Sequence, residues 1–182
     1  MQLLRRTAIA ALVSMVSMSA FALTNTDSHT VTMTVNEIAL IDLDDTTGIT
    51  LTIVAPATGG QQPANATNAT KRLQYTSVVS PAATRTITVS WGGAQGAPAG
   101  TSLLAEITGI TSTIGTCGTV AGSITVSTTA TSLVNGIGGC ATGVGGTDGA
   151  ALQYTLQIDD FTLLEAAQTT NETLTFTLTE DL

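Results

Sequence analysis

The residues of this chain that could do chemistry are mostly carboxylates, which gather in two short acidic runs. Asp42, Asp44 and Asp45 stand in one run, and Asp159-Asp160 form the other. Carboxylate oxygens are ligands that Ca²⁺ prefers, but an EF-hand loop also needs a central glycine and a glutamate at its twelfth position. Neither run has that spacing. We interpret both as solvated acidic turns and predict no metal site and no cofactor.

The residues that nucleophilic catalysis requires are scarce. A serine or threonine nucleophile needs a positioned base, and the only histidine, His29, lies close to the start of the expected mature chain. The glycine-rich stretches 92–100 and 136–149 contain no phosphate-binding or dinucleotide-binding pattern. We predict that the protein is not an enzyme and has no catalytic residues. A glycosidase that uses two of the 13 acidic side chains is the third-ranked alternative.

Cys117 and Cys140 are the only cysteines of the chain. A pair with no cysteine left over is typical of a disulfide in an exported protein, and a loop of this length would gain about 3 kcal/mol on the chain-entropy model. Zinc would need four ligands, and His29 is distant in sequence. We therefore predict a Cys117–Cys140 disulfide.

The N-terminal residues have the three parts of a secretory signal. Arg5 and Arg6 precede an apolar run that extends to about Ser19, and the small residues Ala20 and Ala22 fit a cleavage site. The run is shorter than the roughly 20 apolar residues that span a bilayer. The sequence predicts a cleaved signal peptide at 1–22, a single domain at 23–182 and a secreted or cell-surface protein with no membrane span.

The charge balance narrows the range of partners. The formal net charge is −8, and removing Arg5 and Arg6 leaves 3 basic against 13 acidic residues, or −10. Nucleic acids and anionic membranes are bound by clustered Lys and Arg, which this chain lacks. We predict no nucleic-acid partner.

Apolar and polar residues alternate along most of the chain, as they do in strands with one buried face. The alternation predicts strands near 31–35, 49–53, 73–79, 87–91, 103–107, 152–158 and 174–178, with loops at 58–70, 92–100 and 136–149. About eight to ten short strands with turns between them predict an all-β, antiparallel sandwich of Ig-like or jelly-roll type.

The alternating run nearest the expected cleavage point has a second interpretation. Val31, Met33 and Val35 alternate with threonines, and the run continues to Ile41-Asp42-Leu43. Such a segment, over 29–43, is either the first strand of its own domain or a donor strand that completes a neighbour's sheet. Head-to-tail donation does not close on itself and so builds a fibre.

With its export signal, this opening run and the closing run 173–178, the chain resembles subunits of donor-strand-assembled bacterial fimbriae. The opening run is most similar to that of the colonisation-factor class of pilins. The resemblance implies an Ig-like sandwich, a chaperone-usher pathway and a homopolymer. The alternative function is a secreted module that binds a glycan or a host surface through the loops 92–100 and 136–149.

Overall fold

The computed structural model describes residues 26–111 and 113–181, which form two units. Residues 26–34 contain no helix or strand. The second unit begins at Val35 and contains every strand that the described residues form. The expected signal peptide and its cleavage residues, Ala20 and Ala22, lie outside the described residues.

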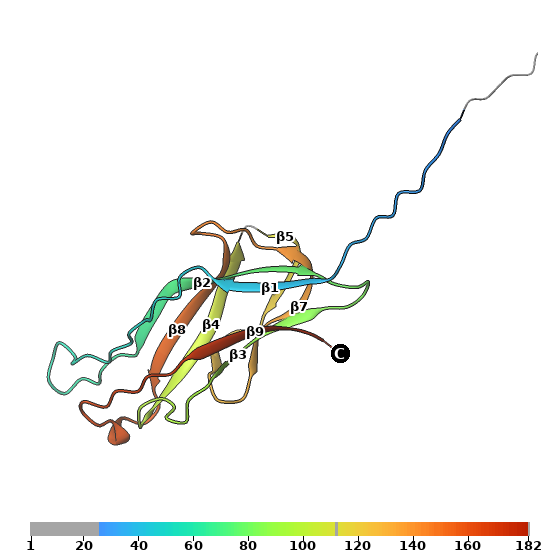
Figure 1. The fold of residues 1–182 in the computed structure, drawn as a ribbon. Coiled ribbons are helices and arrows are strands. Elements are labelled where there is room, and N and C mark those ends of the chain that lie inside the picture. The colour runs from blue at the N-terminus through green and yellow to red at the C-terminus, as the bar shows by residue number, and fades with distance from the viewer. Residues whose placement is uncertain (1–25, 112, 182) are drawn as a thin grey trace, which may run out of the picture. The chain divides into compact units, whose positions relative to one another are not determined.

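The second unit is an all-β sandwich, as the alternation predicts (Figure 1). Its strands are β1 (Ile38–Leu43), β2 (Ala66–Val78), β3 (Arg85–Trp91), β4 (Thr101–Thr111), β5 (Ile114–Val120), β6 (Ile124–Thr125), β7 (Thr131–Ala141), β8 (Gly149–Ile158) and β9 (Leu174–Glu180). A single turn of 3₁₀ helix, η1 (Phe161–Leu163), lies between β8 and β9.

All strand pairs are antiparallel, and they fall into two groups. One group has the order β6-β4-β8-β2-β1, and the other has the order β5-β7-β3-β9. The groups join where Thr76 and Ser77 of β2 pair with Ala141 and Cys140 of β7. Within the described part of the chain, each of β1 and β9 has a paired neighbour on one side only.

The core is formed by apolar side chains from both groups of strands. Leu73, Ile107 and Leu152 come from the first group, and Ile87 and Leu133 from the second, all with at most 1% exposure. These residues occupy the apolar positions of the alternating runs because successive side chains of a strand point to opposite faces. Burying them drives the folding of the domain.

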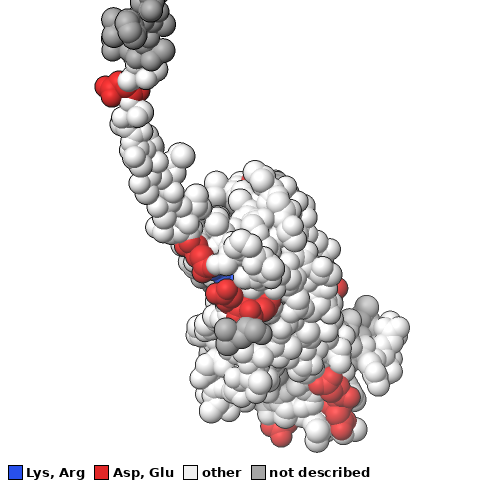
Figure 2. Space-filling view, turned by 90° about the vertical axis from the view of Figure 1, so that its right-hand side faces the viewer, with Lys and Arg blue, Asp and Glu red and all other residues white. Residues whose placement is uncertain are grey.

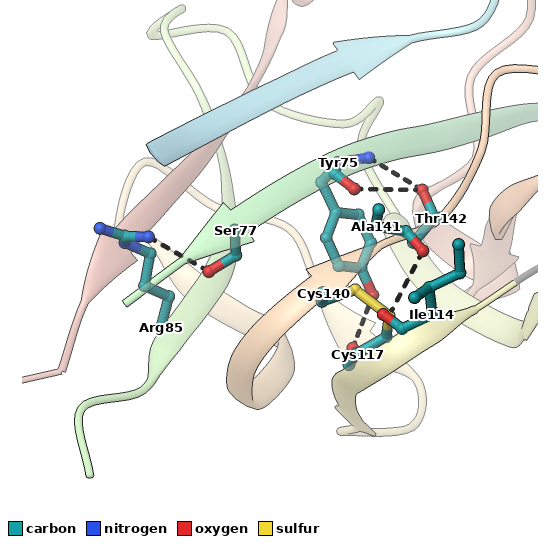
Figure 3. Close-up of a disulfide and its surroundings, with 8 residues drawn as sticks. All are labelled: Tyr75, Ser77, Arg85, Ile114, Cys117, Cys140, Ala141 and Thr142. Atoms are coloured by element: carbon teal, nitrogen blue, oxygen red, sulfur yellow. Dashed lines mark hydrogen bonds between the residues drawn. A yellow bond between two sulfur atoms is a disulfide. The ribbon is translucent and has the colours of Figure 1, made fainter. Parts of the chain in front are cut away.

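Tyr75 connects the two groups of strands, and the disulfide lies beside it within the second group (Figure 3). The Tyr75 hydroxyl donates a 2.7 Å hydrogen bond to the carbonyl oxygen of Cys117, and Thr142 Oγ1 accepts from the Tyr75 backbone N–H at 3.0 Å. The predicted Cys117–Cys140 disulfide is present and links β5 to β7, with Cα atoms 5.0 Å apart. Burial raises the pKa of the Tyr75 hydroxyl to about 12, so this donor keeps its proton at neutral pH.

Residues 31–35, predicted as a strand, lie outside every strand of the structure, and three further segments differ from the sequence expectations. Residues 49–53, predicted as a strand, form no backbone ladder, although their alternation of half-buried and exposed side chains is retained. The predicted loop 58–70 ends early, since β2 begins at Ala66. The predicted loop 136–149 is strand over residues 136–141, which belong to β7 and pair with β5, and residues 142–148 are the loop.

Candidate binding groove

The free edges of β1 and β9 border a groove on the surface of the domain. Among residues 26–111 and 113–181, β1 pairs only with β2, and β9 pairs only with β3. The two strands lie side by side in the domain without forming a ladder (Figure 1). An unpaired edge presents backbone N–H and C=O groups that can pair with another chain. Here two such edges face each other. Since a strand paired with both needs them about 9.6 Å apart, and some Cα atoms of β1 and β9 lie within 8 Å of each other, the edges would have to separate to admit one added strand.

The inward-facing side chains of both edges are apolar. Ile41 and Leu43 of β1 lie opposite Tyr75 and Leu73 of β2 and pack on the core. On β9, the corresponding side chains also pack on the core and are only half-buried; they are Leu174, Phe176 and Leu178. This half-burial marks an apolar surface that the domain itself does not cover.

The groove follows these two edges and continues past the end of β1. Its narrower part, about 320 Å³, is lined by Ile41, Leu43, Leu73, Leu174 and Phe176. Its wider part, about 1040 Å³, continues along residues 46–53. The combined groove is larger than most small-molecule pockets. It also follows two strand edges, which favours an extended polypeptide as its occupant.

Residues 49–53 extend one wall of the groove. Ile49, Leu51 and Ile53 line it, and the first two pack on the core. Since these residues have the alternation of a strand but no ladder, their backbone is available for pairing. The wall formed by β1 therefore continues as an extended segment with the same facing pattern.

Lys71 is a buried cation in the groove lining, and sequence reasoning missed it. Only 4% of its surface is exposed, and its Nζ lies 2.5 Å from Asp45 Oδ2 and 2.9 Å from Thr47 Oγ1. The hydrogen bond from Lys71 is the main cause that lowers the pKa of Asp45 to about 2. The pair fixes the turn between β1 and residues 49–53 on the floor of the groove.

The far end of the groove is closed by the loop that follows β3. Residues 96–99 line it, and Glu172 Oε1 accepts a 2.8 Å hydrogen bond from the Gly96 backbone N–H. Within the described residues, Glu172 Oε2 is a buried oxygen without a hydrogen-bond partner. The predicted binding loop 92–100 thus forms part of the groove, whereas residues 136–141 of the second predicted loop belong to β7.

The three candidate donor residues lie outside every strand. Val31, Met33 and Val35 are 62%, 86% and 84% exposed. By contrast, residues 38–43, the last part of the predicted segment 29–43, pair with β2 of the same domain. Within the predicted segment 29–43, residues 29–37 are thus the part without a strand partner among the described residues.

Residues of both acidic runs accept hydrogen bonds from other residues of the domain. Asp44 Oδ1 accepts from the Arg72 backbone N–H at 2.8 Å, and Asp160 Oδ1 accepts from the backbone N–H and hydroxyl of Thr162. These two hydroxyl and amide bonds lower the pKa of Asp160. Across residues 26–111 and 113–181, no three His, Cys, Asp or Glu side chains are grouped as metal ligands would be.

The aromatic side chains of the domain differ in burial. Tyr75 and Tyr154 are buried, Trp91 and Phe176 are half-buried at the groove, and Phe161 is 49% exposed. Charged side chains cover little of the face seen in Figure 2, where acidic atoms form separate patches and basic atoms are almost absent. In the described part of the chain, no helix has the length and apolar character to cross a membrane.

The chain was compared with protein-family models, with curated proteins and with solved structures. None of the three comparisons found a match. The groove geometry and the pattern of the N-terminal residues are therefore the grounds for a functional proposal.

Proposed function

We propose that this protein is a structural subunit of an extracellular or cell-surface fibre, assembled by β-strand donation between copies. Residues 29–35 of one copy would enter the groove between β1 and β9 of the next copy. The observation that supports this is the pair of free strand edges lined inward by half-buried apolar side chains.

The donor pattern complements the groove. A strand in the groove would place alternate side chains on the core and the others toward solvent. Val31, Met33 and Val35 are apolar at alternate positions, and Thr32 and Thr34 between them are polar. Backbone hydrogen bonds to both edges would supply affinity, and the apolar side chains would supply specificity.

Charge also agrees with a polypeptide donor from a second copy. Residues 29–35 contain no Lys, Arg, Asp or Glu, so their insertion buries no fixed charge. Lys71, the cation at the groove, is already neutralised by Asp45. The donor and acceptor are both present on one chain, so assembly would be heterologous and open-ended.

The test is a pair of substitutions on opposite faces of the donor. We expect Met33→Asp to abolish polymers seen as ladders on an unboiled denaturing gel, because a carboxylate would have to be buried in the groove. Thr34→Asp, which places the same charge on the solvent face, should leave the ladder in place. On the acceptor side, Phe176→Asp and its outward-facing neighbour Thr177→Asp form a second matched pair.

Deletion of residues 24–35 separates donation from an ordinary structural role. The proposal expects a domain that keeps its β-sheet circular dichroism and loses its polymer. Unfolding of the deleted chain would contradict the proposal, since these residues would then belong to their own domain. Unchanged polymer in the deletion, together with binding on a glycan array, would favour the alternative of a carbohydrate-binding module.

A further inference from the structure

The backbone that leads into β1 is held by a clasp of three residues: Glu37, Ser80 and Arg85. The Glu37 carboxylate accepts hydrogen bonds from the Ser80 hydroxyl and from the Ser80 backbone N–H, the latter at 3.1 Å. Its other oxygen lies 3.6 Å from Arg85 Nη2. Ser80 follows β2, whose last residue Val78 pairs with Ile38. The clasp therefore continues the β1–β2 alignment beyond the start of β1.

Arg85 gives the clasp a fixed anchor. It is 5% exposed, and its Nη1 donates to the carbonyl oxygens of Ile38 at 2.5 Å and Val78 at 3.1 Å. The same nitrogen lies 3.1 Å from Ser77 Oγ (Figure 3). The Ser80 hydroxyl lowers the pKa of Glu37, which keeps the carboxylate charged at neutral pH. Residues 37 and 38 are thus tied to the end of β2.

The clasp affects whether residues 29–35 can enter the groove of their own chain. The free edge of β1 borders the groove, so residues 29–35 would have to fold back beside β1 in a hairpin. A two-residue loop at 36–37 would pair Val35 with Ile38 and Met33 with Leu40. Ile38 and Leu40 face outward, at 38% and 64% exposure. Cross-strand partners share a face, so the donor side chains would point away from the core.

With a three-residue loop over 35–37, the donor side chains would point toward the core. Met33 would then pair with Ala39 and Val31 with Ile41, which packs on the core. Hairpins of this length place their last loop residue in the left-handed region, which favours glycine. That residue is Glu37, whose φ is not positive in the structure. Reversal there would also break the hydrogen bonds of the clasp.

We propose that the clasp of Glu37, Ser80 and Arg85 directs residues 29–35 into the groove of a second copy by preventing their insertion into the groove of their own chain. This inference rests on the proposed function. It assigns to Glu37 a positioning role in the choice between a fibre and a self-complemented monomer.

The decisive variant is Glu37→Gly in the full chain. It removes the carboxylate of the clasp and supplies the residue that the three-residue loop needs. We expect the ratio of monomer to polymer to rise about tenfold, the factor that corresponds to the left-handed penalty that glycine avoids. The ratio is measured by size-exclusion chromatography and on unboiled denaturing gels.

Asn36→Gly is the matched control. It adds the same backbone freedom one position earlier and leaves the clasp in place. The tight turn that this glycine favours is a two-residue loop, which would point the donor side chains away from the core. Its monomer-to-polymer ratio should equal that of the unsubstituted chain.

A melting measurement shows whether the Glu37→Gly monomer is self-complemented or simply damaged. A self-complemented monomer should melt above the variant that lacks residues 24–35, and adding Met33→Asp should remove that gain. A Glu37→Gly monomer that melts no higher than the deletion variant contradicts the inference. So does unchanged polymer in Glu37→Gly. If Met33→Asp alone leaves the polymer intact, the proposed function itself is wrong.

Discussion

Lys71 carries a positive charge inside the domain, and Asp45 supplies the opposite charge at the surface. The ammonium group is almost fully buried, whereas half of the Asp45 side chain is exposed. A buried charge without a partner is costly, whereas an exposed carboxylate stays hydrated. Lys71→Met should therefore be tolerated better than Asp45→Ala, because only the second variant leaves an unpaired charge in the groove lining.

The same pair makes stability depend on pH in a defined window. The pKa of Asp45 is lowered from 3.8 to about 2, chiefly by the Lys71 hydrogen bond. A carboxyl group with a lower pKa in the folded state contributes stability above its unfolded pKa and loses it as the pH falls toward its folded pKa. We expect the urea concentration at the unfolding midpoint to decrease as the pH is lowered from 3.8 to about 2. The Asp45→Asn variant should show a smaller decrease over the same pH range. Identical pH profiles for both proteins would contradict this.

At the scale of elements, residues 49–53 have the alternating side chains of a strand without its backbone pairing. Ile49 and Leu51 pack on the core at alternate positions, yet the backbone of the segment has no ladder. Because β9 and this segment both line the groove, a donor strand between them could give that backbone a partner. The segment would then become a strand when the groove is filled.

Hydrogen exchange tests this change. We expect the amides of residues 49–53 to gain protection when a synthetic peptide of residues 28–36 is added to the Met33→Asp chain, which keeps an intact groove. Amides of β5, which lies on the other edge of its sheet, should not change. Protection confined to β1 and β9 would show that the donor pairs with those edges alone.

At the scale of the whole molecule, the sandwich is incomplete where β1 and β9 face each other. Half-buried Leu174 and Phe176 leave apolar area in contact with water, and covering it is favourable by about 25 cal/mol per Å². The stability of one domain is therefore linked to the occupancy of its groove. A fibre subunit of this kind would be more stable assembled than alone.

That linkage predicts a concentration-dependent stabilisation. The Met33→Asp chain should unfold at a higher temperature as the 28–36 peptide is added, by about 2.7 kcal/mol in free energy of unfolding when the peptide is at about 100 times its Kd. A peptide carrying the Met33→Asp change should have no effect. Equal stabilisation by both peptides would show that binding does not use the apolar face.

Much of the fold could be predicted because side-chain alternation is a local property. The runs that contain Ile87, Leu152 and Phe176 predicted strands and inward faces that the structure has. The alternation of side chains shows which face of a segment is apolar. It does not show which other segment, if any, pairs with its backbone. That is why residues 49–53 look like a strand in sequence and form no ladder.

The candidate groove depended on contacts between segments far apart in the chain. By itself the sequence determined the β class, the two cysteines and the apolar pattern of residues 31–35, since each follows from residue types and their spacing. Only the tertiary structure decided that β1 and β9 border a groove without pairing, that Lys71 meets Asp45, and that Glu37 is tied to Ser80 and Arg85. Those features require chain topology, because strand order sets which edges stay free and which distant side chains meet.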